Sequence, residues 1–405
     1  MRPRLESFAA EMFAPLARSD QRAKGQTYLR GLLLDGRRKS MQPMAERLGV
    51  DHQGLQQFVS SSTWAVEPVR ERLARTAVSM IAPDAWVVDD TGFPKDGAAS
   101  PGVARQYSGT LGKVANCQIG VSVQAVTDAA SCPLDWRLFL PERWDDTTAS
   151  SPEQATAIRA RRARAGMSDS VRHREKWRLA LDMLDELAGW GLAPPVVVTD
   201  AGYGDAGEFR AGIAERGWSY VVQVRGELTA HRADAVPERP PYSGRGRPPV
   251  ARYRTAPVDL RAHALAAGRD GAVPITWRQG SRGPLTSQFV ALRVRPAGRA
   301  LVDQKAADGS LPQAWLLAEW PPEAAEPTDY WLSNLGEDTP LAELVRLAKI
   351  RWRIEHDYRE LKTGLGLDHF EGRTFAGWHR HVTLVTAASL FVTLLRADPK
   401  ADTPA

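Results

Sequence analysis

The chain has 405 residues, of which 43% are hydrophobic and 25% are charged, and it carries a formal net charge of +5. This composition excludes a disordered tail, because a chain of this length and apolar content can bury a sizeable core, divided into two or three units. The pI of about 9.3 favours polyanionic partners. Two cysteines are too few for a disulfide framework or a zinc cluster.

The N-terminal segment has no apolar core of signal-peptide length, and no window approaches 18 consecutive apolar residues. The sequence therefore predicts a cytoplasmic protein without a membrane span.

Residues 1 to about 80 have apolar positions at helical spacing and no alternating stretch, so they are predicted to be helical. Within them, residues 44–59 have the pattern of a helix that ends at Gly49, a short turn, and a second helix that begins near Asp51. This pattern fits a helix-turn-helix and an ordinary helical hairpin about equally well.

From residue 85 the period changes to that of strands. The run AWVVDDTGF is closed by two acids and a glycine, and alternating segments follow at residues 117–128 and 133–141. A helix is then predicted over 175–191, a strand over 194–200 that ends at Asp200, a helix that ends near Gly217, and a strand over 219–226. This order is that of the ribonuclease H-like fold, a mixed five-stranded α/β sheet flanked by helices, in which the first and fourth strands are neighbours.

Residues 226 to about 335 interrupt this order. They hold proline and glycine clusters followed by strand-like pieces, which predicts a β-rich insertion. Within it, Arg245, Gly246, Arg247 and Pro248 spell RGRP, the core of an AT-hook, which lays arginines into a narrow A·T minor groove. A Pro-rich basic loop of this kind is also often only solvated.

After Thr339 and Pro340 a single long helix is predicted. Its apolar stripe is formed by Leu347, Ile350, Ile354, Leu361 and Leu365. Its charged residues recur at spacings of four, four and three on a neighbouring face, and they are Arg351, Glu355, Arg359 and Lys362. Glu355 is therefore predicted at the edge of the buried side, among cations.

Three acids stand out in this arrangement: Asp89 and Asp200 where apolar strands end, and Glu355 on the helix. Carboxylates brought together from distant segments are how a site for two divalent cations is usually built. Each acid also has a simpler explanation, since Asp200 fits a turn residue and Glu355 fits a surface ion pair with Arg351 or Arg359.

Strand order, the three acids and the spacing R-x3-E-x6-K at Arg351, Glu355 and Lys362 together resemble the DDE transposases of bacterial insertion sequences. The resemblance is to the branch with a β-rich insertion and a Tyr-Arg-Glu-Lys signature, and it covers most of residues 80–395. The segments DDTGFPKDG, GVARQYSGTLGKVANCQIGV and TDAGYGD look like one group within that branch. The signature tyrosine is replaced here by Ala348, which leaves the metal-binding acid untouched.

The resemblance implies metal-dependent DNA cleavage at the ends of an insertion sequence and strand transfer into target DNA. Asp89, Asp200 and Glu355 would hold two Mg²⁺ ions, for which Mn²⁺ can substitute. Side chains alternate along a strand, so only one of Asp89 and Asp90 can point into the site. Asp89 is preferred, with Asp90 in reserve, because the first acid of the family takes the form Asp-x-Thr and Asp89 is followed by Thr91. DNA contacts are expected from Arg351, Arg359, Lys362, Arg245 and Arg247.

The implied organisation is a helical DNA-binding region (1–80), a catalytic domain in two parts (81–225 and 336–395), the β-rich insertion (226–335) and a disordered tail (396–405). The implied partners are double-stranded DNA, as terminal repeats and target, and a second copy of the chain in a homodimer. A bacterial cytoplasmic location, with association to the nucleoid when DNA is bound, follows from these partners.

Other groups have two interpretations each. The arginines between Arg159 and Arg178 fit a DNA channel or a solvated helix face. Trp315, Trp320 and Trp331 are expected mostly in the core, although one of them could stack on a displaced base. His379 and His381, two residues apart on a helix, do not face each other and are not expected to bind a metal.

Three other functions fit parts of the sequence: another ribonuclease H-like DNA nuclease, a transposase-derived DNA-binding regulator without catalytic activity, and a carbohydrate hydrolase with paired carboxylates. The long insertion before Glu355 and the cations around it favour a transposase over the first. The presence of all three acids favours it over the second, and the arginine-rich surroundings favour it over the third.

Overall fold

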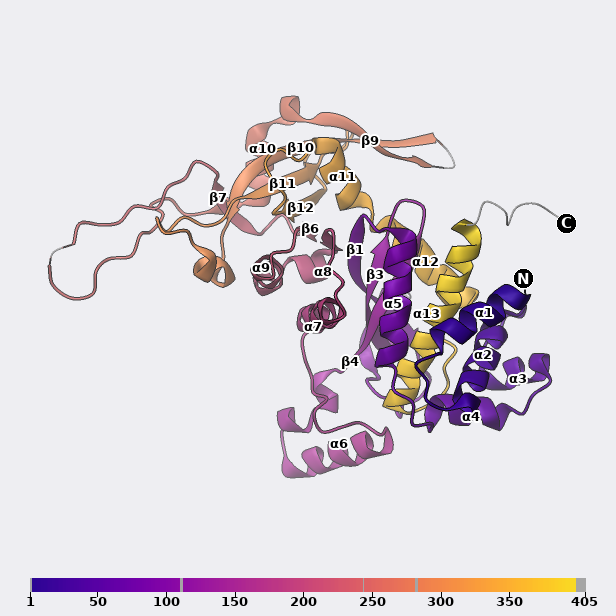
Figure 1. The fold of residues 1–405 in the computed structure, drawn as a ribbon. Helices are drawn as coiled ribbons and strands as arrows, with labels where there is room; N and C mark the ends of the chain where they lie inside the picture. The colour runs from indigo at the N-terminus through magenta and orange to yellow at the C-terminus, as the bar shows by residue number, and fades with distance from the viewer. Residues whose placement is uncertain (1, 110–111, 243, 281–282, 398–405) are drawn as a thin grey trace. The chain divides into compact units, whose positions relative to one another are not determined.

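The computed structural model describes residues 2–109, 112–242, 244–280 and 283–397, and its fold is mixed α/β with an open, mixed sheet (Figure 1). The chain forms two compact units. Unit 1 comprises Met1–Asp84, Val88–Ala193 and Trp352–Ala405, and unit 2 comprises Ala85–Val87 and Pro194–Arg351. The first strand is thus shared between the units.

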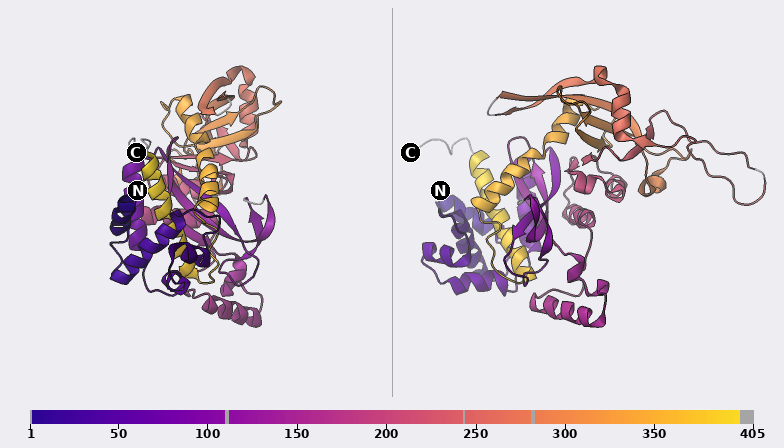
Figure 2. Two further views of the ribbon diagram at one scale, coloured as in Figure 1. Left: turned by 90° about the vertical axis from the view of Figure 1, so that its right-hand side faces the viewer. Right: turned by 180° about the vertical axis from the view of Figure 1, so that it is seen from behind.

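Unit 1 begins with helices, as the spacing of apolar residues predicted. They are α1 (Arg2–Met12), α2 (Ser19–Leu33), α3 (Met41–Leu48), α4 (His52–Ser60) and α5 (Glu67–Ile81). Helices α1, α2 and α4 pack against the long helix α13 (Phe375–Ala397). Figure 2 shows the indigo N-terminal helices beside this yellow helix. Because α13 is apolar on nearly all sides and buried from Gly377 to Ala388, it forms the centre of this helical layer.

The strands of unit 1 are β1 (Ala85–Pro94), β2 (Ala104–Ser108), β3 (Lys113–Val126) and β4 (Ser131–Phe139). Strand β3 lies beside β1, and it pairs antiparallel with β2 through residues 113–117 and with β4 through residues 119–126. The strands predicted at 85–93, 117–128 and 133–141 are confirmed. Strand β2 was not predicted, since its five residues, ARQYS, carry no apolar alternation.

Further along unit 1, two short turns, η1 (Glu142–Trp144) and η2 (Asp146–Thr148), precede α6 (Pro152–Arg164) and α7 (Lys176–Gly189). The helix predicted over 175–191 is α7, whose apolar residues Ala180, Leu181, Met183, Leu184 and Leu187 are buried. Helix α7 packs against β3 and β4, so the sheet of unit 1 is covered by this helix as well as by α5 and α13.

Unit 2 is built on β5 (Val197–Thr199) and β6 (Tyr220–Val224), which are parallel. Between them are α8 (Ala201–Gly204) and α9 (Gly207–Glu215). The amide of Trp86, at the start of β1, donates a hydrogen bond to the carbonyl of Val196 at 2.8 Å. The apolar run before Asp200 is therefore held in the sheet, as the sequence predicted for a strand buried on both faces.

The rest of unit 2 is rich in strands, as predicted. It contains β7 (Thr229–Arg232), β8 (Val258–Asp259), α10 (Leu260–Ala267), η3 (Arg269–Gly271), β9 (Val273–Gly280), β10 (Gly283–Pro296), η4 (Arg299–Gln304), β11 (Ala314–Glu319) and β12 (Asp329–Ser333). Strand β12 pairs antiparallel with β6, and the order continues through β11, β10, β7 and β8. These strands therefore extend the sheet that β5 and β6 begin.

The prediction of a single last helix was wrong. Helix α11 (Leu341–Lys349) ends at Ile350, and α12 (Trp352–Thr363) begins after Arg351. No proline or glycine stands at the break. The break coincides with the boundary between the units, because α11 packs against β6 and β9 of unit 2 whereas α12 packs against β3 and β4 of unit 1.

Buried polar contacts tie the helices of unit 1 to its sheet. The guanidinium of Arg70 on α5 donates to the carboxylate of Asp135 on β4 at 2.9 Å and to the hydroxyl of Thr383 on α13 at 3.0 Å. The side chains of Arg70 and Asp135 are 4% and 0% exposed, so neither charge is left to water. Arg137 adds a second ion pair to Asp135 at 2.8 Å. Loss of one partner would leave a buried charge uncompensated.

His381 on α13 makes buried contacts with another helix and with the segment after α12. Its Nδ1 is 2.9 Å from the hydroxyl of Tyr28 on α2, and its Nε2 is 3.0 Å from the carbonyl of Gly366. The carbonyl can only accept, so Nε2 carries the proton and Nδ1 accepts from Tyr28. Burial lowers the pKa of His381 to about 4, which means that the imidazole is neutral in the folded chain at pH 7.

No helix within the ranges that the structure describes is both long and apolar enough to cross a membrane. Helix α13 runs to Ala397. Of the predicted disordered tail, residues 398–405 lie outside the described residues.

We predict that acid weakens the fold through His381. The unfolded chain takes up this proton near pH 6.5 and the folded chain only near pH 4, so the contribution of His381 is complete above pH 6.5 and is lost as the pH falls toward 4. Between pH 7 and pH 4 the loss is about 3 kcal/mol in the free energy of unfolding. Urea unfolding of the natural chain and of His381→Gln at both pH values measures it, and an equal pH dependence of the two proteins would contradict it.

Candidate active site

Strand β1 presents its two acids on opposite faces. The residues before them, Trp86, Val87 and Val88, are fully buried, which fixes the strand in the sheet. Asp89 is 7% exposed. The carboxylate of Asp90 forms an ion pair with the ammonium of Lys176 on α7 at 2.7 Å. Because side chains alternate along a strand, the ion pair of Asp90 directs Asp89 to the other face.

The glycine three residues beyond Asp89 is required by its surroundings. The carbonyl of Gly92 accepts a hydrogen bond from Nζ of Lys362 on α12 at 2.7 Å. A Cβ atom on Gly92 would collide with the hydroxyl of Ser108 on β2. Strand β1 is thus in contact with β2 and α12 at this point, and a side chain would force one of them away.

Helix α12 is fixed against the sheet of unit 1 by a second polar contact. The hydroxyl of Tyr358 is 2.7 Å from the hydroxyl of Ser122 on β3, and both residues are buried. The pKa of Tyr358 is well above its usual value, first because of burial and then because of the negative charge of Asp89. Tyr358 therefore lies close to the Asp89 carboxylate.

Glu355 occupies the same side of α12 as these contacts. It stands three residues before Tyr358 and seven before Lys362, positions that share one face of a helix. Glu355 is exposed, whereas Tyr358 and Lys362 are 7% and 8% exposed. Within unit 1, Asp89 and the face of α12 that carries Glu355 are thus brought together by one interface.

Lys362 is buried. Burial lowers its pKa to about 8, and its ammonium lies 5.8 Å from the centre of the Phe93 ring. The hydrogen bond from Lys362 to Gly92 holds α12 on β1. A contact of Lys362 with DNA phosphate stays a prediction.

Two arginines were also predicted to contact phosphate. Arg359 is exposed on α12, and Arg351 is half-buried in the short segment between α11 and α12.

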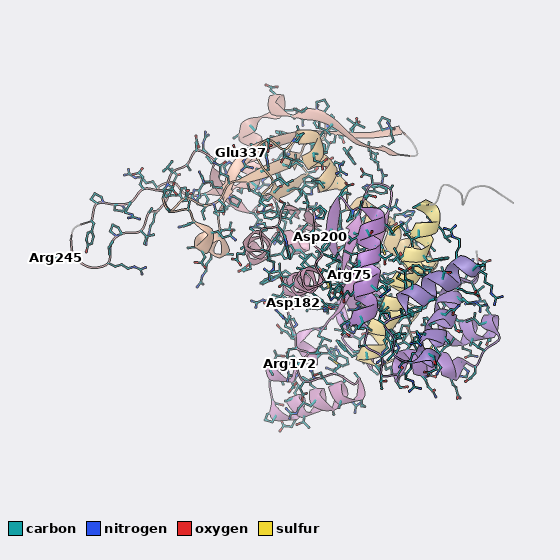
Figure 3. All side chains as sticks on the ribbon, in the orientation of Figure 1. Arg75, Arg172, Asp182, Asp200, Arg245 and Glu337 are labelled. Atoms are coloured by element: carbon teal, nitrogen blue, oxygen red, sulfur yellow. The ribbon has the colours of Figure 1, made fainter. Side chains whose placement is uncertain are left out.

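Asp200 lies in unit 2, at the junction of β5 and the short helix α8 (Figure 3). The backbone is tight after it. A Cβ atom on Gly204 would collide with the carbonyl of Gln223 on β6, and Tyr203 is 2% exposed. The segment AGYG is therefore a helical turn that packs closely against β6. This packing fixes the point at which β5 ends, and with it the position of Asp200 within unit 2.

Residues 11–284 match the family described as DDE superfamily endonuclease, which is 274 residues of the 405. The chain belongs to this family. It is also 26% identical, over 213 residues, to a protein of Microchaete diplosiphon described as "Probable transposase for insertion sequence element IS701". That match covers 52% of the chain and 50% of the relative, so the chain spans about half the length of the protein it matches.

The family match ends at residue 284, before α11 and α12. Asp89 and Asp200 therefore lie inside the matched residues of this DDE endonuclease, and Glu355 lies outside them. The position of Glu355 is supported by the geometry of α12 alone.

A second acidic group of the endonuclease lies on the same helix as Glu355. His356, Asp357 and Glu360 have ligand atoms within 4.8 Å of one another. Asp357, however, accepts hydrogen bonds from Arg353 at 3.1 Å and from the hydroxyl of Ser131. Glu360 is paired with Arg396 at 2.8 Å. These carboxylates are already neutralised by arginines, and we assign no metal to the group.

Most of the arginines between Arg159 and Arg178 form ion pairs or hydrogen bonds within unit 1. Arg162 is 2% exposed and donates to the carbonyl of Trp144 at 2.9 Å. Arg172 pairs with Asp146, and Arg174 pairs with Asp182 at 2.6 Å. These contacts favour a stabilising role over a DNA channel.

Two of the three tryptophans considered for base stacking are buried. Trp320 and Trp331 are 5% and 4% exposed, and the indole of Trp315 lies 5.1 Å from the guanidinium of Arg293. By contrast, Arg245 and Arg247 are exposed, and Arg245 stands at the far end of the long loop between β7 and β8 (Figure 3).

The sequence did not reveal Tyr358, Ser122 or Lys176. Tyr358 had a local signal, because it stands between Glu355 and Lys362 on the same helical face. Ser122 had none, since its partner is 236 residues away along the chain.

We predict that Tyr358 and Ser122 stabilise the endonuclease as a pair. Tyr358→Phe and Ser122→Ala should each lower the free energy of unfolding by about 1 kcal/mol, because each leaves a buried hydroxyl without this partner. The double variant should lose less than the sum of the two. Urea unfolding measures these values, with Tyr107→Phe, an exposed tyrosine on β2, as the control. Strictly additive losses would show that the hydroxyl pair is not coupled.

Proposed function

We propose that this DDE endonuclease is a transposase that cleaves DNA at the ends of an insertion sequence and transfers the freed strand into target DNA. The observation that carries the proposal is the interface of α12 with β1 and β3, which holds the Glu355 face of the helix beside Asp89. The similarity to a probable insertion-sequence transposase supports the same function.

A ribonuclease H-like catalytic fold is part of the proposal. The hydrogen-bonded strand order β4-β3-β1-β5-β6 supports it, with β3 and β4 antiparallel and β5 and β6 parallel. The helix α7 between β4 and β5, and the helix α9 between β5 and β6, stand where that fold has its helices. In this fold the strands that carry Asp89 and precede Asp200 are neighbours.

Asp89, Asp200 and Glu355 are proposed to hold two divalent cations, with Mg²⁺ the natural ion and Mn²⁺ a substitute. The donor chemistry fits, because all three are carboxylates, which are hard ligands, and the two cysteines are buried with raised pKa values and do not compete as thiolates. Asp89 is 7% exposed on β1, and its charge acts on the buried phenol of Tyr358 on α12. When bound, such ions lower the pKa of an attacking hydroxyl and stabilise charge on the phosphate.

The other residues of α12 and β1 position this site. Lys362 fixes Gly92, and with it the strand end beyond Asp89. Lys176 on α7 pairs with Asp90 on the opposite face of β1, away from the proposed site. Arg359, exposed on α12, and Arg351, at its start, are proposed to bind phosphate oxygens of the DNA strand beside the acids.

The proposed partners are double-stranded DNA and, in the DNA complex, a second copy of the chain. A cytoplasmic location, with association to the nucleoid through DNA, belongs to the same proposal.

We predict that Asp89→Asn, Asp200→Ala and Glu355→Gln each abolish cleavage of DNA that carries the element's ends, and leave binding to those ends largely intact. The reason is that each removes a proposed cation ligand without changing a DNA contact. Asp90→Asn is the matched control and keeps cleavage. Removal of divalent ions with EDTA should stop the reaction of the natural chain, and added Mg²⁺ or Mn²⁺ should restore it.

Cleavage retained by Asp200→Ala would remove Asp200 from the site. Strand joining is measured in the same reactions. Hydrolysis without joining would indicate another kind of ribonuclease H-like nuclease, and DNA binding by the natural chain without any cleavage would indicate a regulatory protein.

The RGRP loop is proposed to contact an A·T minor groove through Arg245 and Arg247. We predict that the double variant Arg245→Ala, Arg247→Ala binds A·T-rich DNA more weakly, with a salt dependence whose slope falls by about 2, one for each lost cation. Arg254→Ala, which removes an exposed arginine already paired with Glu238, is the control. Equal binding by the double variant and the natural chain would leave the loop without a DNA role.

A further inference from the structure

Helices α3 and α4 are joined by a turn of three residues that is fixed at both ends. Gly49 adopts the left-handed conformation, with φ 66° and ψ 34°, and its amide bonds back to the carbonyls of α3, which ends that helix. Asp51 caps α4, because its carboxylate accepts a hydrogen bond from the amide of Gln53 at 3.2 Å. The turn therefore sets one defined orientation between two short helices, as in a helix-turn-helix.

One face of α4 is anchored in unit 1. Leu55, Phe58 and Val59 are at most 2% exposed, and α4 packs against α2, α3 and α13. The ring of Phe58 stacks on Trp64, with centroids 5.3 Å apart. Since α13 is the buried centre of the helical layer, α4 is held rigidly from this side.

The opposite face of α4 is made almost entirely of amides. His52, Gln53, Gln56 and Gln57 are exposed, and the helix has no Asp, Glu, Lys or Arg. A solvated helix face usually carries charges. A carboxamide instead offers one donor and one acceptor side by side, which matches the N6 and N7 atoms of adenine in the major groove.

The surroundings of α4 are basic. Residues 20–60 contain seven Lys and Arg residues against four Asp and Glu residues. Arg37 and Arg38 are exposed in the loop between α2 and α3, and Arg38 pairs with Glu371 at 2.5 Å. The guanidinium of Arg47 on α3 donates to the carbonyl of Arg38 at 2.7 Å, which holds this loop against α3. An uncharged amide face beside fixed cations is complementary to base edges flanked by phosphates.

We infer that α4 is a recognition helix that enters the major groove of DNA, where Gln53, Gln56 and Gln57 read base edges, while Arg37 and Arg47 bind the flanking phosphates. The nine residues of α4 are about 13 Å long, which suits a groove about 12 Å wide. The inference rests on the proposed function in taking the element's end as the DNA that is read, and it concerns binding only.

The inference is tested with the full chain and a pool of random duplex DNA, from which bound sequences are selected. The natural chain should select a motif that contains adenines. Gln53→Ala, Gln56→Ala and Gln57→Ala should each relax one or two adjacent positions and weaken binding to the selected site by about 5- to 150-fold. Gln154→Ala, an exposed glutamine on α6, is the matched control and should leave the motif unchanged.

A change of base preference separates reading from mere stability. Gln53→Glu removes the amide donor, so the preferred base at its position should shift from adenine to cytosine, whose N4 amine donates to a carboxylate. Arg37→Ala should instead weaken binding to all sequences about equally. Thermal unfolding of each variant confirms that it is folded.

An unchanged motif and unchanged affinity in all three glutamine variants would overturn the inference, as would the absence of any motif for the natural chain. Cleavage of element ends is measured separately on the natural chain. Cleavage together with an unchanged motif in the variants removes the inference and leaves the proposed function. A motif that shifts in the variants of a chain that does not cut supports the inference and removes the proposed function.

Discussion

The contact of α12 with β1 and β3 is the constraint on which the proposed site depends. Two polar bonds define it, from Lys362 to the Gly92 carbonyl and between Tyr358 and Ser122. Burial of the Lys362 ammonium is unfavourable because the charge loses its hydration, as the lowered pKa indicates. The hydrogen bond from Lys362 to the Gly92 carbonyl offsets part of this loss and sets the position of α12 along β1. Glu355 and Asp89 belong to these two elements, so any slip of the helix would move one acid relative to the other.

Helix α12 is separate from α11. The chain breaks at Ile350 and Arg351, and each helix packs on its own unit. The break also explains why the spacing of Arg351, Glu355 and Lys362 is not a face of one helix, because Arg351 precedes the first turn of α12.

Much of the fold could be predicted from periodicity. In six elements the apolar residues recur with the spacing of a strand or a helix over the length of the element: β1, β3, β4, α7, β5 and β6. Strand β2 and the break at Arg351 leave no such pattern, since the first depends on pairing with β3 and the second on packing in different units. The same division holds for the site. Asp89 and Glu355 were visible as a strand-end acid and a helical spacing, whereas the Tyr358–Ser122 contact joins residues 236 positions apart and arises only from tertiary structure.

The contacts within unit 1 also connect the helix-turn-helix to the segment after α12. His381 on α13 binds Tyr28 of α2 through one ring nitrogen and the carbonyl of Gly366 through the other. Gly366 lies three residues beyond the end of α12, and α2 packs against α3 and α4. If α4 reads DNA, the spacing between the bases it reads and the phosphodiester bond beside Asp89 and Glu355 is therefore set by packed contacts inside one unit. A rigid spacing of this kind is what allows an endonuclease to cut at a fixed distance from the sequence it recognises.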